Sequence, residues 1–460
     1  MLNPQGFVTF QVMPGIATAK RYHIWTIGCQ MNEADSRHLG SQLEALGYRE
    51  TGTVDNADVV VLNTCVVRQQ AENKAIGRLS SLKSAKAARP EMTIGLMGCM
   101  VGMREAPRLQ KQFPFVDVFM PPSDTAPLLD YFAEQGAYDE SALLETREKA
   151  IRNAVQNEEH ILPALSRGSA VTANVPIVLG CSHACTFCVI PYRRGAERSL
   201  PPAKVLKEVR ALVNQGVREV MLLGQIVDRY GTDLDEQTNL ANLLRQVSEV
   251  DGLKRIRFLT SHPNWMTDGL LDAVAELDKV CPHIEVPVQA GNDEVLERMR
   301  RGYTNREYRD LIGRIRKRVP GATINTDIIV GFPGETEAQF QDTVDLMRDL
   351  RLDKHHIAKY SERPKTIAAR QMPDDITEDE KERRRKILDD IQTEILTARN
   401  TRYLGTTVEI LVEDQQKTRW RGRTPDNRLV FFELDENHCG SLANIRITRT
   451  GPYSLFGEFE

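Results

Sequence analysis

Short apolar runs alternate with helix-like segments between residues 22 and 135. Four of these runs read HIWTIG, ADVVVLNTC, MTIGLMGC and FVDVFM. This alternation is typical of βαβ units and predicts an open parallel α/β sheet. We expect the first helix to begin at Glu33, with Asn32 as its N-cap, and to end before Gly47.

The alternation resumes at Val175 and predicts a second parallel sheet. Strands are expected near residues 175–180, 217–224, 254–260, 283–288, 323–330 and 354–360, with helices between them. One helix should begin at Pro201 and Pro202, and a later one should open with the capping box Thr336-x-x-Gln339. Six strand-helix units fall short of the eight of a closed barrel, so we expect an open, partial (β/α)6 barrel with its mouth at the carboxyl ends of the strands.

The last part of the chain changes character twice. Thr377-x-x-Glu380 is a capping box that should begin one long charged helix, and from Thr406 strand-like runs separated by turn residues predict a small antiparallel β-barrel. The patterns divide the chain into a flexible N-terminus, an N-terminal α/β domain, a polar linker, the partial barrel and the C-terminal barrel. Their expected limits are residues 1–19, 20–136, 137–170, 171–400 and 401–460.

The composition is that of a globular protein with several domains. The chain has 460 residues, of which 41% are hydrophobic and 27% charged, and no run of about 18 apolar residues that would span a bilayer. The N-terminal segment lacks the basic and apolar regions of a signal peptide, so we expect a cytoplasmic protein with no membrane partner. A net charge of -4 argues against a surface coated in positive charge, but it leaves room for a local basic patch.

Six of the eight cysteines fall into two groups of three. The first group is Cys29, Cys65 and Cys99. The second group lies in the run CSHACTFC and is Cys181, Cys185 and Cys188. The members of the first group are 36 and then 34 residues apart, and each follows a predicted strand of the N-terminal sheet. Loops at the carboxyl ends of parallel strands gather at one edge, so we expect these three thiols to be neighbours in space.

Three clustered thiols admit four chemical interpretations. A closed tetrahedral zinc site needs a fourth ligand, and the only local one is His183 inside the same tight loop. Disulfide exchange lacks a thioredoxin-like context, and a purely structural role is hard to reconcile with three cysteines between Gly180 and Pro191. An iron-sulfur cluster held by three thiolates, with one iron left open for a reactant, fits the pattern best.

The spacing C-x3-C-x2-C resembles the signature of the radical S-adenosylmethionine (SAM) superfamily. The aromatic Phe187 before the last cysteine belongs to the same signature. The resemblance implies that Cys181, Cys185 and Cys188 bind a 4Fe-4S cluster. The open iron of that cluster is chelated by SAM, and one electron cleaves SAM to a 5'-deoxyadenosyl radical. Phe187 is expected to lie against the SAM adenine.

A wider resemblance covers nearly all of residues 20 to 460. Runs similar to those of the MiaB-type tRNA methylthiotransferases are GCQMNEADS at 28–36, CVIPYRRGAERS at 188–199, LLGQ at 222–225, PVQAGND at 287–293, RMRRGYT at 298–304 and TDIIVGFPGET at 326–336. That family has an N-terminal methylthiotransferase domain, a radical SAM partial barrel and a C-terminal TRAM domain, in the order of the three regions inferred above. By this resemblance Cys29, Cys65 and Cys99 bind a second 4Fe-4S cluster. Each turnover then uses two SAM molecules, one to methylate a sulfide on the second cluster and one to supply the radical.

The resemblance implies that the enzyme inserts sulfur and a methyl group at C2 of N6-isopentenyladenosine beside the tRNA anticodon, giving 2-methylthio-N6-isopentenyladenosine. A general base of ordinary pKa cannot remove the C2 hydrogen, so we assign no catalytic side chain. Threonylcarbamoyladenosine in tRNA or a ribosomal protein are alternative substrates within the superfamily. A non-catalytic iron-sulfur protein that binds RNA is a further alternative. The reaction also needs an electron donor such as flavodoxin or ferredoxin, and a sulfur donor that the sequence does not identify.

Several residues are expected at the mouth of the barrel. Those predicted to contact SAM are Gly224, Gln225, Gly331, Pro333 and Gly334, although glycines at these positions could simply make turns. Positions that depart from the usual family pattern are Ile226, Asp228, Glu285 and the run SERPKT at 361–366. The departures affect substrate contacts near the mouth and leave both cysteine groups unchanged. The two remaining cysteines, Cys281 and Cys439, are expected to be structural.

The run TRWRGRTPDNR in the C-terminal barrel combines cations with an aromatic ring. Its arginines could pair with phosphates while its tryptophan stacks on a base. The expected RNA-binding residues are Arg419, Trp420, Arg421, Arg423 and Arg428. A solvated pair of strands would show a similar pattern.

Overall fold

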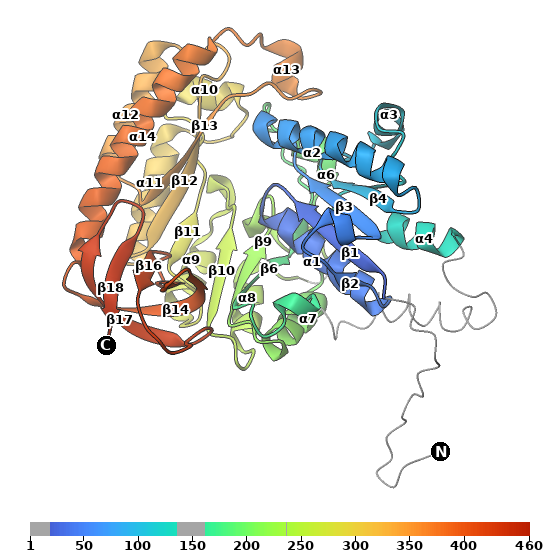
Figure 1. The fold of residues 1–460 in the computed structure, drawn as a ribbon. Helices are drawn as coiled ribbons and strands as arrows, with labels where there is room; N and C mark the ends of the chain where they lie inside the picture. The colour runs from blue at the N-terminus through green and yellow to red at the C-terminus, as the bar shows by residue number, and fades with distance from the viewer. Residues whose placement is uncertain (1–18, 136–161, 236) are drawn as a thin grey trace.

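The computed structural model describes residues 19–135, 162–235 and 237–460. Figure 1 shows an N-terminal sheet with its helices in blue, a central barrel from green to orange, and a small C-terminal barrel in red. Residues 1–18 of the predicted flexible N-terminus (1–19) and residues 137–161 of the predicted linker (137–170) lie outside the described residues, so the limits assigned to the domains stay predictions. None of the described helices is both long and apolar enough to cross a membrane.

The N-terminal part is a parallel sheet of five strands, as the alternation of apolar runs predicts. The strands lie in the order β2-β1-β3-β4-β5, and all neighbours run parallel. The strands are β1 Arg21–Thr26, β2 Arg49–Glu50, β3 Val59–Thr64, β4 Thr93–Gly98 and β5 Val118–Met120. The helices are α1 Gln30–Ala45, α2 Gln69–Ala88, α3 Ala106–Gln112 and α4 Ala126–Glu134. Val60, Leu62 and Ile94 are fully buried, because the central strands of a parallel sheet are covered on both faces.

Helix α1 differs from its prediction at its start. Cys29 stands at the N-cap, so Asn32 lies inside the first turn, where it is fully buried. The side-chain amide of Asn32 donates from Nδ2 to the carbonyl oxygens of Ile27 and Thr64, 3.1 and 3.0 Å away. Capping was the wrong role for Asn32, because these carbonyls at the strand ends are buried and need a donor. The predicted end of the helix is confirmed, since Gly47 follows it with φ +89°.

The central part is an open barrel of six parallel strands. Two sheets, β10-β9-β6 and β11-β12-β13, are joined by a bridge between Ile256 and Val280. The strands are β6 Thr172–Pro176, β9 Glu219–Leu223, β10 Arg255–Leu259, β11 His283–Glu285, β12 Thr323–Val330 and β13 Lys354–Lys359. The outer helices are α7 Pro202–Asn214, α8 Leu240–Ser248, α9 Asp268–Glu276, α10 Asp293–Arg298, α11 Asn305–Arg318 and α12 Glu337–Leu350. The strand positions and the capping box of Thr336 with Gln339 are as predicted.

Helix α14 (Glu378–Asn400) leads into the C-terminal barrel. Thr377 accepts a hydrogen bond from the Glu380 amide, but the Glu380 carboxylate binds Arg383 and Arg384 instead of returning to Thr377, so the described contacts form only half of the predicted capping box. The barrel closes in the order β14-β15-β16-β18-β17 and is antiparallel except between β16 and β18. Its strands are β14 Thr407–Gln416, β15 Arg419–Arg423, β16 Leu429–Phe432, β17 Leu442–Thr450 and β18 Leu455–Phe459.

The C-terminal barrel is docked against the amino-terminal end of the central barrel. Arg257 of β10 is fully buried, and its Nη1 and Nη2 donate to the carbonyl oxygens of Pro425 and Thr424, both at 2.8 Å. Arg428 forms an ion pair with the buried Asp353, which directly precedes β13. The loop between β15 and β16 therefore covers the end of the central barrel that lies opposite the mouth.

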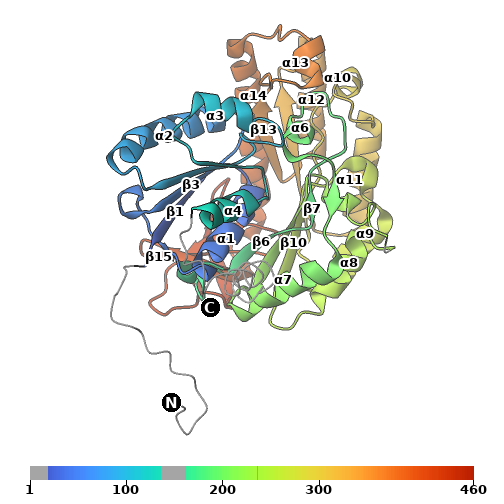
Figure 2. The ribbon, with the colours of Figure 1, turned by 90° about the vertical axis from the view of Figure 1, so that its right-hand side faces the viewer.

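The N-terminal sheet is docked on the central barrel through α1. Figures 1 and 2 both place α1 beside β6. Met31, near the start of α1, is buried against Leu223 and Leu259 at the carboxyl ends of β9 and β10. His38 also pairs with Glu208 of α7 at 2.9 Å. Because α1 begins directly after Cys29, this packing brings the cysteine edge of the N-terminal sheet to the mouth of the barrel.

Candidate active site

Three neighbouring strands of the N-terminal sheet end at the first group of cysteines. Cys29 follows β1, Cys65 follows β3 and Cys99 follows β4, and the sheet places these strands side by side. The chain order reverses beside β1, which is the point where open α/β sheets bind ligands. The Cys99 amide donates to the Thr64 carbonyl at 2.9 Å and holds the last loop against the middle one. The structure therefore brings the three cysteines together, as their spacing predicts.

A glycine directly before a cysteine shapes one loop in each cysteine group. At Gly98 φ is +97°, and an added Cβ would lie 2.5 Å from the Thr64 carbonyl oxygen. At Gly180 φ is +68°, and an added Cβ would lie 2.1 Å from the Ala196 carbonyl oxygen. Only glycine fits either position. The repeated Gly-Cys pair is a sequence signal for the site that the strand pattern does not contain.

The second group lies in the loop between β7 (Val178–Leu179) and α6 (Ile190–Arg194). The Cys181 amide donates to the Gly195 carbonyl at 3.1 Å. The Thr186 hydroxyl donates to the Arg298 carbonyl at 2.8 Å. These bonds fix both halves of the loop at the mouth of the barrel.

A buried cation and apolar side chains surround the second group. Arg301, only 5% exposed, donates from Nη1 to the Cys185 sulfur at 3.2 Å. Ile226, one of the departures from the family pattern, packs in the same apolar cluster as two of the thiols. Phe187 lies edge-on to Phe332 with ring centroids 6.5 Å apart. Contact between Phe187 and an adenine stays a prediction.

Burial makes the thiolate form of these cysteines costly. It raises the pKa of Cys65, and it raises the pKa of Cys99 to about 11 although the Arg194 guanidinium opposes the shift. In the second group burial raises the pKa of Cys181 to about 11 and that of Cys188 to about 12. Buried thiolates need a metal or a cation to be stable. The donor set therefore fits iron, which adds positive charge to that of the nearby Arg194 and Arg301 guanidiniums.

The grouping of donors goes against a single metal ion. Among residues 19–135, 162–235 and 237–460, no three His, Cys, Asp or Glu side chains are placed to hold one ion. One zinc ion draws its ligands together, whereas a 4Fe-4S cluster spreads its cysteines over different irons. The ring of His183, the fourth zinc ligand considered above, packs against that of His262 with centroids 4.8 Å apart. Three thiolates with no close fourth donor suit a cluster better than zinc.

Two of the residues predicted to contact SAM have structural roles. Gly331 (φ +69°) and Gly334 (φ +74°) lie in left-handed turns. Their amides donate to the carboxylates of Glu335 and Asp375, at 2.6 and 2.8 Å. The turn alternative therefore accounts for both glycines. Contact with SAM stays a prediction for all five residues, Gly224, Gln225, Gly331, Pro333 and Gly334.

Polar side chains face the interior of the barrel on β11, β12 and β13. Ile284 and Ile328 belong to the core beneath the outer helices, so by strand alternation Glu285, Asp327 and His356 face the interior. Asp327 and His356 are directly paired in the sheet register. In the described part of the chain, the side chains of these three residues make no hydrogen bond. They are the polar groups that a substrate in the barrel would meet.

The charge of these interior groups is set mainly by burial. Burial and the neighbouring Asp327 raise the pKa of Glu285 to about 7. Burial raises the pKa of Asp327 to about 6, although Arg68 of the N-terminal domain opposes the shift. Burial and Lys354 lower the pKa of His356 to about 4. Near neutral pH the interior therefore offers a neutral imidazole and carboxyl groups that can be protonated.

Two other departures from the family pattern have defined places. Asp228 accepts a hydrogen bond from the His262 amide at 3.0 Å, and burial raises its pKa to about 7. Arg363, in the run at 361–366, donates to the Val66 carbonyl at 3.2 Å and pairs with Glu72 at 3.0 Å. Through Arg363 the altered run therefore contacts the N-terminal domain beside Cys65.

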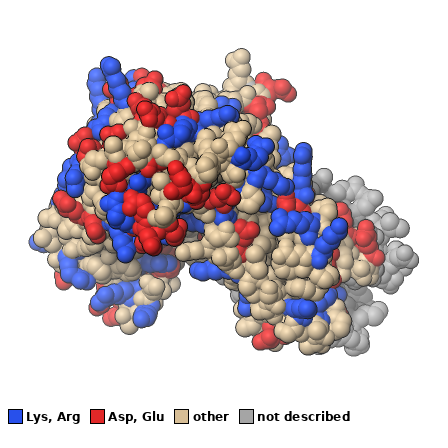
Figure 3. Space-filling view, turned by 90° about the horizontal axis from the view of Figure 1, so that it is seen from above, with Lys and Arg blue, Asp and Glu red and all other residues tan. Residues whose placement is uncertain are grey.

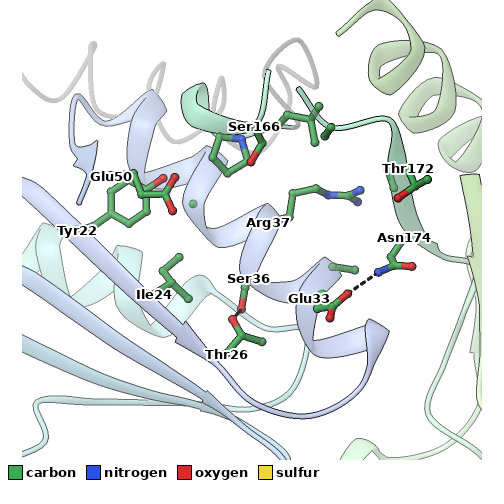
Figure 4. Close-up of a pocket in the computed structure, with 16 residues that line it drawn as sticks. Tyr22, Ile24, Thr26, Glu33, Ser36, Arg37, Glu50, Ser166, Thr172 and Asn174 are labelled. Atoms are coloured by element: carbon green, nitrogen blue, oxygen red, sulfur yellow. Dashed lines mark hydrogen bonds between the residues drawn. The ribbon is translucent and has the colours of Figure 1, made fainter. Parts of the chain in front are cut away.

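A separate cavity of about 300 Å³ lies between β1, α1 and β6 (Figure 4). Arg37 extends from α1 across it toward Thr172 and Asn174. None of the predicted site residues is among the described residues that line this cavity.

The predicted RNA-binding residues of the C-terminal barrel do not share one surface. Trp420 is 7% exposed, belongs to the barrel core and donates from Nε1 to the Leu434 carbonyl at 2.9 Å, so its ring is not free to stack on a base. Arg428 is buried in its pair with Asp353. The expectation for these two residues was wrong, because barrel closure and docking bury them. Three arginines remain nearer the surface and pair with acidic neighbours, namely Arg419, Arg421 and Arg423.

Models of three protein families match successive parts of the chain. They are the uncharacterized protein family UPF0004 over residues 21–121, the radical SAM superfamily over residues 175–347 and the TRAM domain over residues 401–459.

Two relatives that match at least 95% of this chain carry the same name. The tRNA-2-methylthio-N(6)-dimethylallyladenosine synthase of Roseiflexus sp. (strain RS-1) is 46% identical over 442 residues, which cover 95% of this chain and 89% of the relative. The protein of the same name from Dehalococcoides mccartyi (strain CBDB1) is 44% identical over 443 residues, 96% and 98% of the two chains. Among solved structures, the fold is similar to that of the radical S-adenosylmethionine methyltransferase TsrM from Kitasatospora setae. The TM-score is 0.55 at 14% identity, and the match covers 76% of this chain and 77% of the other.

Proposed function

The chain belongs to the family of tRNA-2-methylthio-N(6)-dimethylallyladenosine synthases, and from that premise we propose that it converts N6-isopentenyladenosine beside the tRNA anticodon into its 2-methylthio derivative. The observation that carries the proposal is the meeting of two cysteine groups where the N-terminal sheet docks on the barrel mouth. Each group supplies three thiols, so a 4Fe-4S cluster on it would keep one iron for a reactant. A chain with one such group could make a radical or hold sulfur, but not both.

The enzyme uses an iron-sulfur cluster and SAM, and we propose that it holds two clusters. Cys181, Cys185 and Cys188 would bind the cluster that activates SAM. Cys29, Cys65 and Cys99 would bind the one that carries sulfur. Bound clusters of this kind supply low-potential electrons and an open iron. The protein contributes thiols of which Cys65, Cys99 and Cys181 are buried, loops fixed by backbone hydrogen bonds, and the docking of α1 that holds the two sites together.

The substrate base is expected to enter the barrel on the side of β11, β12 and β13. A protonated carboxyl can donate to a ring nitrogen of adenine, and an ionised one can accept from the N6 hydrogen. Glu285 and Asp327 offer both forms near neutral pH, because burial raises the pKa of each. A base in the anticodon loop is already partly unstacked, so moving it into the barrel costs less than opening a duplex.

The tRNA partner is supported by a second surface besides the C-terminal barrel. Figure 3 shows mainly Lys and Arg on the side of the upper face formed by α2 and α3, whereas both signs of charge alternate over α12 and α14. The exposed cations here are Arg68, Lys74, Arg104, Arg108 and Lys111. We propose that phosphates of the anticodon arm lie on this surface, beside the mouth of the barrel.

The alternative substrates and the non-catalytic alternative are not favoured, because two relatives that match 95% and 96% of this chain are both named tRNA-2-methylthio-N(6)-dimethylallyladenosine synthase. A donor such as flavodoxin or ferredoxin remains the expected source of electrons. The sulfur donor is not identified. A cytoplasmic location follows from the tRNA substrate as an expectation.

The test is mass spectrometry of tRNA nucleosides after anaerobic incubation with SAM, sulfide and a reductant. The expected product is 2-methylthio-N6-isopentenyladenosine, formed on tRNA that carries the isopentenyl group and not on tRNA that lacks it. Cys185→Ala is the matched inactive control. Product on threonylcarbamoyladenosine or on a ribosomal protein, with none on isopentenylated tRNA, would overturn the proposal.

A further inference from the structure

A buried arginine from the central barrel reaches into the N-terminal cysteine site. Arg194 is the last residue of α6 and follows Cys188 by six positions. Its side chain is 2% exposed. Nη2 donates to the Asn32 side-chain oxygen at 2.8 Å, and Nη1 donates to the Ser123 hydroxyl at 3.3 Å. Arg194 therefore leaves its own domain and ends among residues of the N-terminal sheet.

The guanidinium lies close to the thiols of that site. Its positive charge opposes the rise in the pKa of both Cys99 and Cys65, which places it near these two thiols. The side-chain oxygen of Asn32 accepts the hydrogen bond from Arg194. The same oxygen lies 3.7 Å from the Cys29 sulfur. One side chain of α6 therefore lies near all three cysteines of the N-terminal site.

Asp35 partly balances this charge. The Asp35 carboxylate is also 2% exposed, lies 3.4 Å from Arg194 Nη2 and accepts a hydrogen bond from Ser123 at 2.7 Å. Arg194 and Asp35 therefore form a buried pair with its positive member toward the cysteines. Since burial weakens screening by water, each member should influence a nearby redox group strongly and with opposite sign.

We propose that Arg194 is a positioning residue that raises the reduction potential of the N-terminal iron-sulfur cluster. It also couples that cluster to the loop between β7 and α6 that carries the second cysteine group. The inference rests on the proposed function, because it requires a cluster on Cys29, Cys65 and Cys99. Reduction adds negative charge, which a cation or a hydrogen bond to cysteine sulfur stabilises. The segment from Cys188 to Arg194 joins the two sites, so a shift of the loop at one cluster moves the charge at the other.

The test measures the midpoint potential of this cluster in the full-length chain. The three cysteines of the second group are first replaced by alanine, so that one cluster remains, and its iron content is determined. Potentiometric titration followed by electron paramagnetic resonance then compares Arg194→Met, Arg194→Lys and Asp35→Asn with this parent. Arg301→Met is the matched control, because Arg301 is a buried arginine that contacts the other group.

The expected shifts differ in sign. Arg194→Met should make the midpoint potential more negative, Asp35→Asn should make it more positive, and Arg194→Lys should stay near the parent because the charge is kept. The control should not move the potential. Equal shifts of Arg194→Met and Asp35→Asn in one direction, or no shift in either, would overturn the inference while leaving the second cluster in place. A parent without iron would overturn the second cluster of the proposed function, and the inference with it.

Discussion

Replacing Arg257 with methionine should loosen the contact between the two barrels. Arg257 is fully buried, donates from Nε to Glu219 at 2.9 Å, and donates to two carbonyl oxygens of the loop between β15 and β16. Methionine fills most of the volume but leaves Glu219, which is 3% exposed, without its partner. Removing one member of a buried ion pair costs about 3 to 5 kcal/mol. Each unpaired buried carbonyl adds about 1 to 3 kcal/mol unless water reaches it.

Hydrogen exchange of residues 419–432, followed by mass spectrometry, reports this local opening. At 1.4 kcal/mol for each tenfold change, a loss of about 4 kcal/mol should speed exchange in the loop by between two and three orders of magnitude. The double variant Arg257→Met, Glu219→Met should recover most of the loss, because an apolar pair of similar volume can replace a buried ion pair at little cost.

Arg419→Met is the matched surface control. Arg419 pairs with Glu433 at 3.0 Å with both side chains exposed, and such pairs contribute about 0 to 1 kcal/mol. If the loop exchanges in Arg257→Met at the rate of the unchanged protein, Arg257 does not hold the C-terminal barrel in place. The docking of this barrel against the amino-terminal end of the central barrel would then be wrong.

Two further predictions concern RNA binding and pH. Arg104→Gln with Arg108→Gln should flatten the salt dependence of tRNA binding, by about 0.7 in slope for each lost contact to single-stranded phosphate, when Kd is measured at several salt concentrations; an unchanged slope would remove α3 from the RNA surface. The folded state raises the pKa of Glu285 from 4.5 to about 7 and therefore favours its protonated form. This preference contributes to the stability of the folded protein fully below pH 4.5, and the contribution should be lost as the pH rises through 7. The loss is at most about 3 kcal/mol, less where water reaches the carboxyl. Thermal melts should show a smaller fall in Glu285→Gln, with a remainder from Asp327; parallel curves would show that the pKa of Glu285 is not raised.

The sequence predicts the strands well because each is a short apolar run between polar helices. Val59–Thr64 is buried on both faces, and four of its six residues are apolar. The first cysteine group could also be predicted, because a cysteine at the end of a parallel strand must lie at the carboxyl edge of the sheet. What pattern cannot reveal is how three separate parts are docked.

Trp420 and Arg428 show most clearly what the sequence pattern cannot predict. A tryptophan among arginines suits an RNA surface and the core of a small barrel equally well, and only barrel closure decides between them. Arg428 has a partner 75 residues earlier in the chain, so its burial follows from docking alone. Asn32 and Arg194 escape prediction for the same reason, since their partners belong to other strands or another domain.

The separation of roles between the two cysteine groups is the central claim, and one reaction tests it. Cys65→Ala and Cys185→Ala, with Cys439→Ala as a control outside both groups, are incubated with SAM, reductant and isopentenylated tRNA. The amounts of 5'-deoxyadenosine and of 2-methylthio-N6-isopentenyladenosine are measured together. Cys65→Ala should form 5'-deoxyadenosine without the methylthio product, Cys185→Ala should form neither, and the control should form both. Methylthiolated tRNA from Cys65→Ala would contradict the account.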